Sequence, residues 1–249
     1  MSTAVVSPSR PTVARRSGPS LPAQVGLEVR KSLSTRSGLA LAGAAVLIAP
    51  AAMAVAASSG TLHSATGPLV VTGMLSVLVL IALGVLSTAG EWTHGSVQTT
   101  YLLEPRRSRV LATKAAAVAL MGAVLAVVAA GLASGVLALL EPGLSWDGGG
   151  RAIAMVVLGG AAFSLIGAGV GAALANTPGA LTLIYLVDLG VLPLLQTVKP
   201  ALADRIDPGN AVLELAQGTH QAQSVAILAV WVGAALAAGA VMDRRRAVQ

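Results

Sequence analysis

Long apolar runs alternate with short polar connections along most of the chain. A helix of about 20 apolar residues crosses the hydrocarbon core of a bilayer. Six runs predict transmembrane spans, over residues 38–57, 68–89, 112–139, 152–175, 180–197 and 222–242. The third run is long enough to tilt or to extend beyond the lipid. The fifth run is irregular because it contains Asp188 and Pro193.

The composition favours a membrane protein over a soluble one. Of the 249 residues, 55% are hydrophobic and 10% are charged, whereas a soluble domain carries about 25% charged residues. So few charges cannot cover a chain of this length with a solvated surface. We predict an all-α polytopic membrane protein whose transmembrane domain covers residues 37–243. The absence of cysteine excludes disulfides, thiolate metal sites and cysteine nucleophiles.

The Lys and Arg residues of the connections predict the orientation. With a cytoplasmic N-terminus, the inner segments carry thirteen basic residues and the outer segments three, Arg151, Lys199 and Arg205. Because both ends of the chain are basic, the number of spans must be even, and six satisfy this. The first run is predicted to be a retained span rather than a signal peptide, since five more spans follow. The bias explains the net charge of +6 without a nucleic-acid partner.

The N-terminal segment divides into two parts. Residues 1–20 are rich in Ser, Pro and Arg, which predicts a disordered cytoplasmic tail, and residues 244–249 form a second, basic tail. Residues 21–36 predict an amphipathic helix on the inner membrane surface, although an extension of the first span also fits. Its apolar positions recur every fourth residue, and its polar candidates for the membrane interface are Glu28, Arg30, Lys31 and Arg36.

The outer connection over residues 198–221 is the longest one. Its apolar residues are interspersed with charges, and two short helices broken at Asp207-Pro208-Gly209 would fit. Such helices re-enter the membrane only where other helices cover their backbone, and a plain surface loop is the alternative.

Asp188 is the one carboxylate near the middle of a predicted span. Because a charge there is costly, the side chain should face protein or water. Asp188 is therefore a candidate intramembrane polar site, either for a proton or cation or as a hydrogen-bonded acid of the bundle. The three histidines lie in different connections, so we predict no metal site.

The stretch GEWTHGSVQTTYLLEPRRSRVLATK begins at residue 90 and contains the only long inner connection between spans. Thr99 to Leu103 can form a short helix that ends before Pro105, because the residue before proline resists helical geometry. Tyr101 and its two leucine neighbours would supply an apolar contact surface. The arginines that follow would face lipid headgroups or an acidic partner. A positive-inside anchor explains these arginines but not the rest of the stretch.

The stretch resembles the inner loop of permease subunits in ABC-2-type transporters, a family of six-span bacterial exporter permeases. The matching motifs are Glu91-Trp92, Gly95-Ser96, Thr100-Tyr101-Leu102, Pro105-Arg106-Arg107 and Lys114. The segment Glu28-Val29-Arg30-Lys31 is similar to the first helix of that family, and six spans with a long last outer connection fit its architecture.

The resemblance implies a mechanism. A short cytoplasmic coupling helix between the second and third spans would dock on a separate ABC ATPase subunit, and a second permease would complete the translocation unit as a homodimer or a related heterodimer. This chain has no GxxxxGK[ST] motif, so ATP and Mg²⁺ would bind the partner and the chain would be no enzyme. The residues assigned to this coupling loop are Glu91, Trp92, Gly95, Thr100, Tyr101, Leu102, Leu103, Glu104, Pro105 and Arg107.

Two other functions stay open. An ion-coupled secondary transporter should have paired ionisable groups in its spans or an internal repeat, and the sequence offers Asp188 alone. A non-transporting membrane anchor would not need the Glu91 to Arg107 set. The expected location is the bacterial cytoplasmic membrane, in contact with lipid and with both termini inside. The cargo, a small molecule, a lipid or a polymer precursor, is not specified.

Overall fold

The structure is a computed structural model that describes residues 20–103 and 106–246. Over these residues the fold is helical, apart from one isolated bridge between Ser64 and Ser145. This confirms the predicted all-α class, and six helices are long and apolar enough to cross a membrane, as predicted. They are α2 (Arg36–Ser58), α3 (Thr66–Thr93), α5 (Arg107–Leu140), α6 (Gly149–Leu174), the composite helix Thr177–Val198, and α11 (Gln221–Arg245).

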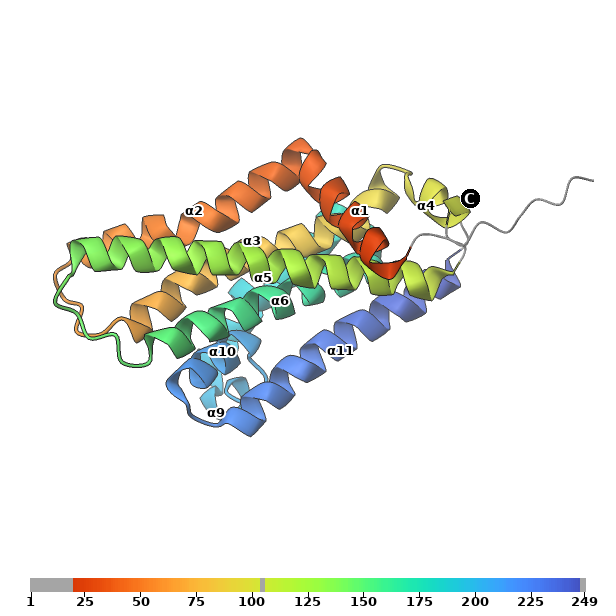
Figure 1. Ribbon diagram of the computed structural model, residues 1–249. Helices are drawn as coiled ribbons and strands as arrows, with labels where there is room; N and C mark the ends of the chain where they lie inside the picture. The colour runs from red at the N-terminus through yellow and green to blue at the C-terminus, as the bar shows by residue number, and fades with distance from the viewer. Residues whose placement is uncertain (1–19, 104–105, 247–249) are drawn as a thin grey trace, which may run out of the picture.

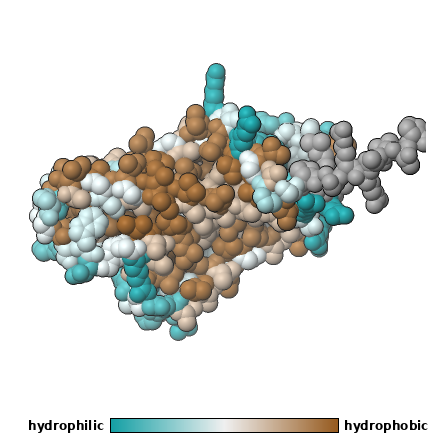
Figure 2. Space-filling view, in the orientation of Figure 1, coloured by the Kyte–Doolittle hydropathy of each residue, from teal (hydrophilic) through white to brown (hydrophobic). Residues whose placement is uncertain are grey.

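The six long helices lie side by side with their connections at two opposite ends (Figure 1). One end carries α1 (Leu21–Ser34), α4 (Val97–Leu103) and the C-terminal end of α11, and we call it the inner end. The opposite, outer end carries the α2–α3 and α5–α6 connections. Figure 2 shows a hydrophobic surface over the middle of the bundle and hydrophilic residues at its ends, which is the distribution expected of a multi-pass membrane protein.

Several helices extend beyond the predicted spans, and α3 continues to Thr93, four residues past the predicted end. The helix of the third span begins at Arg107, and α11 continues to Arg245 into the expected basic tail. Arginines are favourable in the last turn of a helix because they interact with its dipole, which explains the longer α11. The predicted tail over residues 1–20 lies outside the described residues except for Ser20, and residues 247–249 also lie outside them.

Helices α3 and α6 form the centre of the bundle, and glycines let them approach closely. A Cβ atom on Gly84 would lie 2.1 Å from the carbonyl oxygen of Ser164, and one on Gly167 would lie 2.2 Å from that of Ile81. No side chain fits such a gap. By contrast, Cβ atoms on Gly131 and Gly135 of α5 would meet no atom of the described residues within 4 Å, so these two glycines lie at open positions.

The fifth span is helical but irregular, as its sequence indicated. It consists of α7 (Thr177–Tyr185), the π-helical segment η1 (Leu186–Val191) and α8 (Leu192–Val198). The wider turn comes directly before Pro193. Proline lacks the amide hydrogen that an α-helix needs and its ring crowds the preceding turn, and a π-type turn accommodates both without breaking the helix. Asp188 lies in this turn.

The outer connection contains α9 (Pro200–Ala203) and α10 (Pro208–Gln217), separated where the sequence predicted a break. Asp207 caps α10, because its Oδ1 accepts hydrogen bonds from the backbone nitrogens of Gly209 at 2.7 Å and Asn210 at 3.2 Å. At the other end of α10, Arg151 Nε donates to the carbonyl of Leu215 at 2.7 Å. The Arg151 bond joins α10 to α6.

Candidate functional site

Four charged side chains from three helices meet at the inner end. Lys114 Nζ of α5 lies 2.7 Å from Glu28 Oε2 of α1 and 2.6 Å from Glu91 Oε1 of α3. Lys31 of α1 also binds Glu91. Glu91 and Lys114 are only 7% and 5% exposed. We call Glu28, Lys31, Glu91 and Lys114 the inner charge cluster; because buried charges must be paired to be tolerated, it fastens α1 to α3 and α5.

Helix α4 is attached to the end of α11. Tyr101 Oη donates a hydrogen bond of 2.5 Å to Asp243 Oδ1. The guanidinium of Arg107 lies over the Tyr101 ring, 5.0 Å from its centroid. Arg107 Nη1 also donates to the backbone carbonyls of Asp243 and Arg246. These carbonyls belong to the C-terminal end of α11, where a cation is favourable.

Arg246 extends this chain of contacts to α6 and α3. Its guanidinium donates to the carbonyls of Ala172, at 2.8 Å, and Ala173 in the last turn of α6. It also lies over the Trp92 ring at the end of α3, 5.5 Å from the centroid. The contacts therefore connect α4 through α11 with α6 and α3.

The environment of Tyr101 keeps its phenol protonated. Burial raises the pKa of Tyr101 above its ordinary value, and the hydrogen bond to Asp243 and the charge of that carboxylate raise it further. The Arg107 cation acts in the opposite direction and is outweighed. The Tyr101 hydroxyl is thus the donor to Asp243 at physiological pH.

Helix α4 has an inward and an outward face. Val97 is buried, and Tyr101 and Thr100 face the bundle, where Thr100 Oγ1 lies 3.5 Å from Glu91 Oε2. Leu102 is 84% exposed. Gly95, with φ of +68°, forms the turn between α3 and α4 in a conformation that favours glycine. The result is a short helix held on one side that presents a large apolar side chain on the other.

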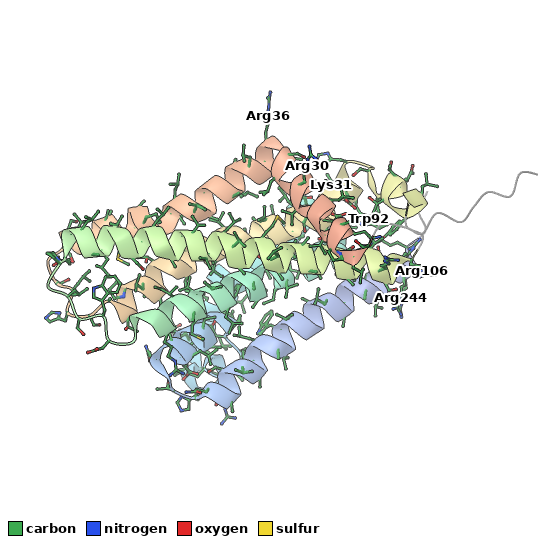
Figure 3. All side chains as sticks on the ribbon, in the orientation of Figure 1. Arg30, Lys31, Arg36, Trp92, Arg106 and Arg244 are labelled. Carbon is green, nitrogen blue, oxygen red and sulfur yellow. The ribbon has the colours of Figure 1, made fainter. Side chains whose placement is uncertain are left out.

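The predicted interfacial residues divide between protein and surface. Sequence reasoning set Glu28 and Lys31 away from the apolar stripe of α1, but both side chains point to Glu91 and Lys114 in the bundle. The physical reason is the buried Lys114, which needs carboxylate partners. The apolar stripe of α1 packs on the bundle as well, through Val29 and Leu33. Arg30 and Arg36 are exposed, and Figure 3 shows Arg36 directed away from the helices.

The predicted coupling-loop residues fall into three groups. Glu91, Trp92, Thr100, Tyr101 and Arg107 have bonds or ring contacts that hold the loop in place, whereas Leu102 is exposed. Leu103 ends α4, and Glu104 and Pro105 lie outside the described residues.

Sequence reasoning missed two members of the site, Asp243 and Arg246. One signal for Asp243 was present, because it is an acidic residue directly before the basic run Arg244 to Arg246 at the end of the last span.

A cavity of about 580 Å³ adjoins the inner charge cluster, and we call it the inner cavity. Its walls come from α1, the start of α2, the inner half of α3, the α3–α4 turn and the start of α7. Leu83, Leu86 and Gly38 supply apolar surface, and most of the polar groups are hydroxyls and the charged ends of Glu28, Lys31 and Glu91. A mainly apolar cavity with a few polar groups has the character of a small-molecule site.

A second candidate lies toward the outer end. Asp188 lines a groove of about 410 Å³ between η1, α3 and the start of α10, together with Asp207, Gln196 and Asn210. The Asp188 carboxylate makes no hydrogen bond or ion pair with any residue in the described ranges. Within these ranges no group of three His, Asp or Glu side chains is placed to hold a metal ion.

Neither a comparison with protein-family models nor a comparison with curated proteins gives a match for this chain.

Proposed function

We propose that this chain is the transmembrane permease subunit of an ATP-driven transporter of the ABC-2 type. A separate ATPase subunit, which binds ATP and Mg²⁺, docks on α4 at the inner end. Closure of two ATPase subunits moves α4, and the spans then switch the cargo's access from one side of the membrane to the other. In this proposal the membrane is the bacterial cytoplasmic membrane, and both termini are cytoplasmic.

The outward face of α4 is the observation that carries the proposal. Leu102 is 84% exposed, and it lies on a short helix whose other side is bound to the bundle through Tyr101. A leucine in this position fits an apolar groove on a partner. The exposed Arg106, directly before α5, suits an acidic rim on that partner. The position of α4, between the second and third long helices, agrees with the coupling helix of the family that the sequence resembles.

The contacts of the inner end would transmit a movement of α4. A displaced α4 pulls on Asp243 through Tyr101 and Arg107, and α11 is joined to α6 through Arg246. On its other side, α4 adjoins Glu91, which is held by two lysines. Rigid helices joined by paired charges transmit a force better than flexible loops do.

A second permease is part of the proposal. The composite helix Thr177–Val198 and α11 are the least buried of the six, and exposed leucines such as Leu186 and Leu194 cover the former. Lipid accounts for some of this apolar surface, and a homodimeric or related subunit would cover the rest. Cargo would pass along this interface, with α9 and α10 closing its outer end.

An ion-coupled secondary transporter is the second candidate, and Asp188 is the observation that favours it. A carboxylate without a partner within a span is what proton or cation coupling uses. Transport into vesicles distinguishes the two: the ATP-driven protein needs ATP and its partner, and the secondary transporter needs only an ion gradient. A non-transporting anchor would need neither.

Co-purification tests the proposal. The tagged chain, extracted from membranes of its source cells, should bring with it a P-loop ATPase whose hydrolysis is inhibited by vanadate. Leu102→Asp should lower the recovered ATPase about tenfold or more, because a charge would be forced into an apolar contact.

Leu139→Asp is the matched control. Leu139 is 83% exposed at the outer end of α5, and its substitution should leave the recovered ATPase unchanged. Equal recovery from the two variants, or the absence of any ATPase from the wild-type preparation, would contradict the docking role of α4.

A further inference from the structure

The inner cavity is large enough for an organic molecule and opens beside charged groups. Its volume of about 580 Å³ lies in the range of small-molecule sites. The apolar residues Leu83 and Leu86 would contact the body of a ligand, while Glu28, Lys31 and Glu91 lie together at one side. The shape and lining suit an amphiphile, a molecule with an apolar body and one polar group.

The sign of the lining charges distinguishes between ligands. Lys31 is the only Lys or Arg among the lining residues, whereas Glu28 and Glu91 are both there. An anion near Lys31 would compete with Glu91 for the ammonium and would face two carboxylates. A cation would instead be attracted by both carboxylates. His94 also lines the cavity but is exposed to solvent.

Within the inner charge cluster, Lys31 can leave Glu91 and so make room for the cation of a ligand. The Lys31 side chain is 47% exposed, so its ammonium can turn into water at little cost. Glu91 stays neutralised because Lys114, with a side chain only 6% exposed, remains bound to it. The ammonium group of a ligand can therefore replace Lys31 at Glu91 without leaving a buried charge unpaired.

The groove beside Asp188, which we call the outer groove, is also lined by negatively charged side chains. Asp188 and Asp207 line it, and no Lys or Arg is among its lining residues. Both recesses are thus lined by carboxylates and apolar side chains, one toward each end of the bundle.

We propose that the inner cavity binds an amphiphilic cation, a molecule with an apolar body and a protonated amine or quaternary ammonium group. Glu91 and Glu28 hold the cation, and Leu83 and Leu86 contact its apolar body. The inference deepens the proposed function, because it names the class of cargo that this permease would accept at its inner end.

Binding to the permease alone tests the inference. The full chain is placed in phosphatidylcholine nanodiscs, and three probes with the same alkyl chain are titrated: decyltrimethylammonium, decanoate and decyl maltoside. Decyltrimethylammonium should bind saturably and about tenfold more tightly than the other two. Equal binding of the three probes, or occupancy by lipid with no binding of the cation, would overturn the proposal.

Two variants locate the site. Gly90 lines the cavity, and a Cβ atom on it would meet no atom within 4 Å, so Gly90→Leu should fill the cavity and weaken binding about tenfold or more. Gly43→Leu, at an equally open position of α2 away from the cavity, should leave binding unchanged.

Lys31→Met removes the competing ammonium and keeps the apolar stem, so it should strengthen binding of decyltrimethylammonium about threefold to tenfold. Weaker binding by Lys31→Met, or equal effects of the two glycine variants, would contradict the site. These results do not depend on the ATPase, so failure here leaves α4 docking untouched, and loss of co-purification leaves this binding intact.

Discussion

Lys114 is a cation inside the protein that two carboxylates hold. Its Nζ lies within 2.7 Å of both Glu28 and Glu91, and these three residues come from three helices. A buried pair of this kind adds little net stability compared with apolar packing, but removal of one member leaves the others uncompensated. The arrangement therefore fixes where α1 lies more than it strengthens the fold.

Lys114→Met should destabilise the protein by about 3–5 kcal/mol, because Glu91 and Glu28 would remain buried without their main cation. Lys31→Met should change stability by no more than about 1 kcal/mol, since the Lys31 side chain is 47% exposed. Thermal unfolding in detergent, followed by circular dichroism, gives both values. Similar losses of stability in the two variants would show that the contribution of each lysine does not depend on how deeply it is buried.

The Tyr101 phenol should ionise at a higher pH than a free phenol does. An unfolded tyrosine ionises near pH 10, and burial with the Asp243 contact raises the pKa of Tyr101 above that. The group therefore stabilises the folded protein below about pH 10, and this contribution is lost as the pH rises through the folded pKa.

The tyrosinate absorbance of Tyr185→Phe, which leaves Tyr101 as the only tyrosine, measures this titration. Its midpoint should lie above that of the denatured chain. Coincident midpoints would place the Tyr101 hydroxyl in water rather than on Asp243.

At the scale of single residues, the sequence located the loop but not its partners. Glu91, Tyr101 and Arg107 stand out because polar residues are rare in so apolar a chain. Tyr101 and Asp243 are 142 positions apart, and no local periodicity connects them. Local patterns report on neighbours one or two turns away, so the contacts that orient α4 required the three-dimensional fold.

Helices α3 and α6 form the most enclosed pair of elements, and their separation is set by glycine. Gly84→Ala should destabilise the protein by about 1–3 kcal/mol, because the new methyl would meet the Ser164 carbonyl at 2.1 Å and push the helices apart. Gly131→Ala on the open face of α5 should be neutral or slightly stabilising. Thermal unfolding of the two variants compares them. A Gly84→Ala protein as stable as Gly131→Ala would contradict the close approach.

The elements themselves were largely predictable. Apolar length locates the six long helices, and Pro208 after Asp207 marks the start of α10. Pro193 and Asp188 indicated an irregular fifth span, but not that it would take the form of a π-helical segment. The choice between a kink, a break and a wider turn depends on tertiary neighbours, here including the bond from Tyr185 Oη to the Leu78 carbonyl at 2.8 Å. Such neighbours do not appear in a local pattern.

For the whole molecule, the elements gathered at the inner end of the bundle determine which side of the membrane that end should face. The inner end gathers α1, α4 and the end of α11 (Figure 1), as an even number of crossings requires. Figure 3 shows the labelled Lys and Arg residues toward this same end, and the positive-inside rule would place such an end in the cytoplasm. The proposal that an ATPase docks on α4 requires the inner end to be cytoplasmic, because ATP is available only on the cytoplasmic side.

Labelling of single cysteines tests the assignment most directly, and the chain has no native cysteine. A membrane-impermeant maleimide should not label Leu102→Cys in intact cells and should label it after lysis. Gly143→Cys, in the exposed outer connection between α5 and α6, should react in intact cells. Labelling of Leu102→Cys from outside intact cells would place α4 away from any ATPase and contradict the account.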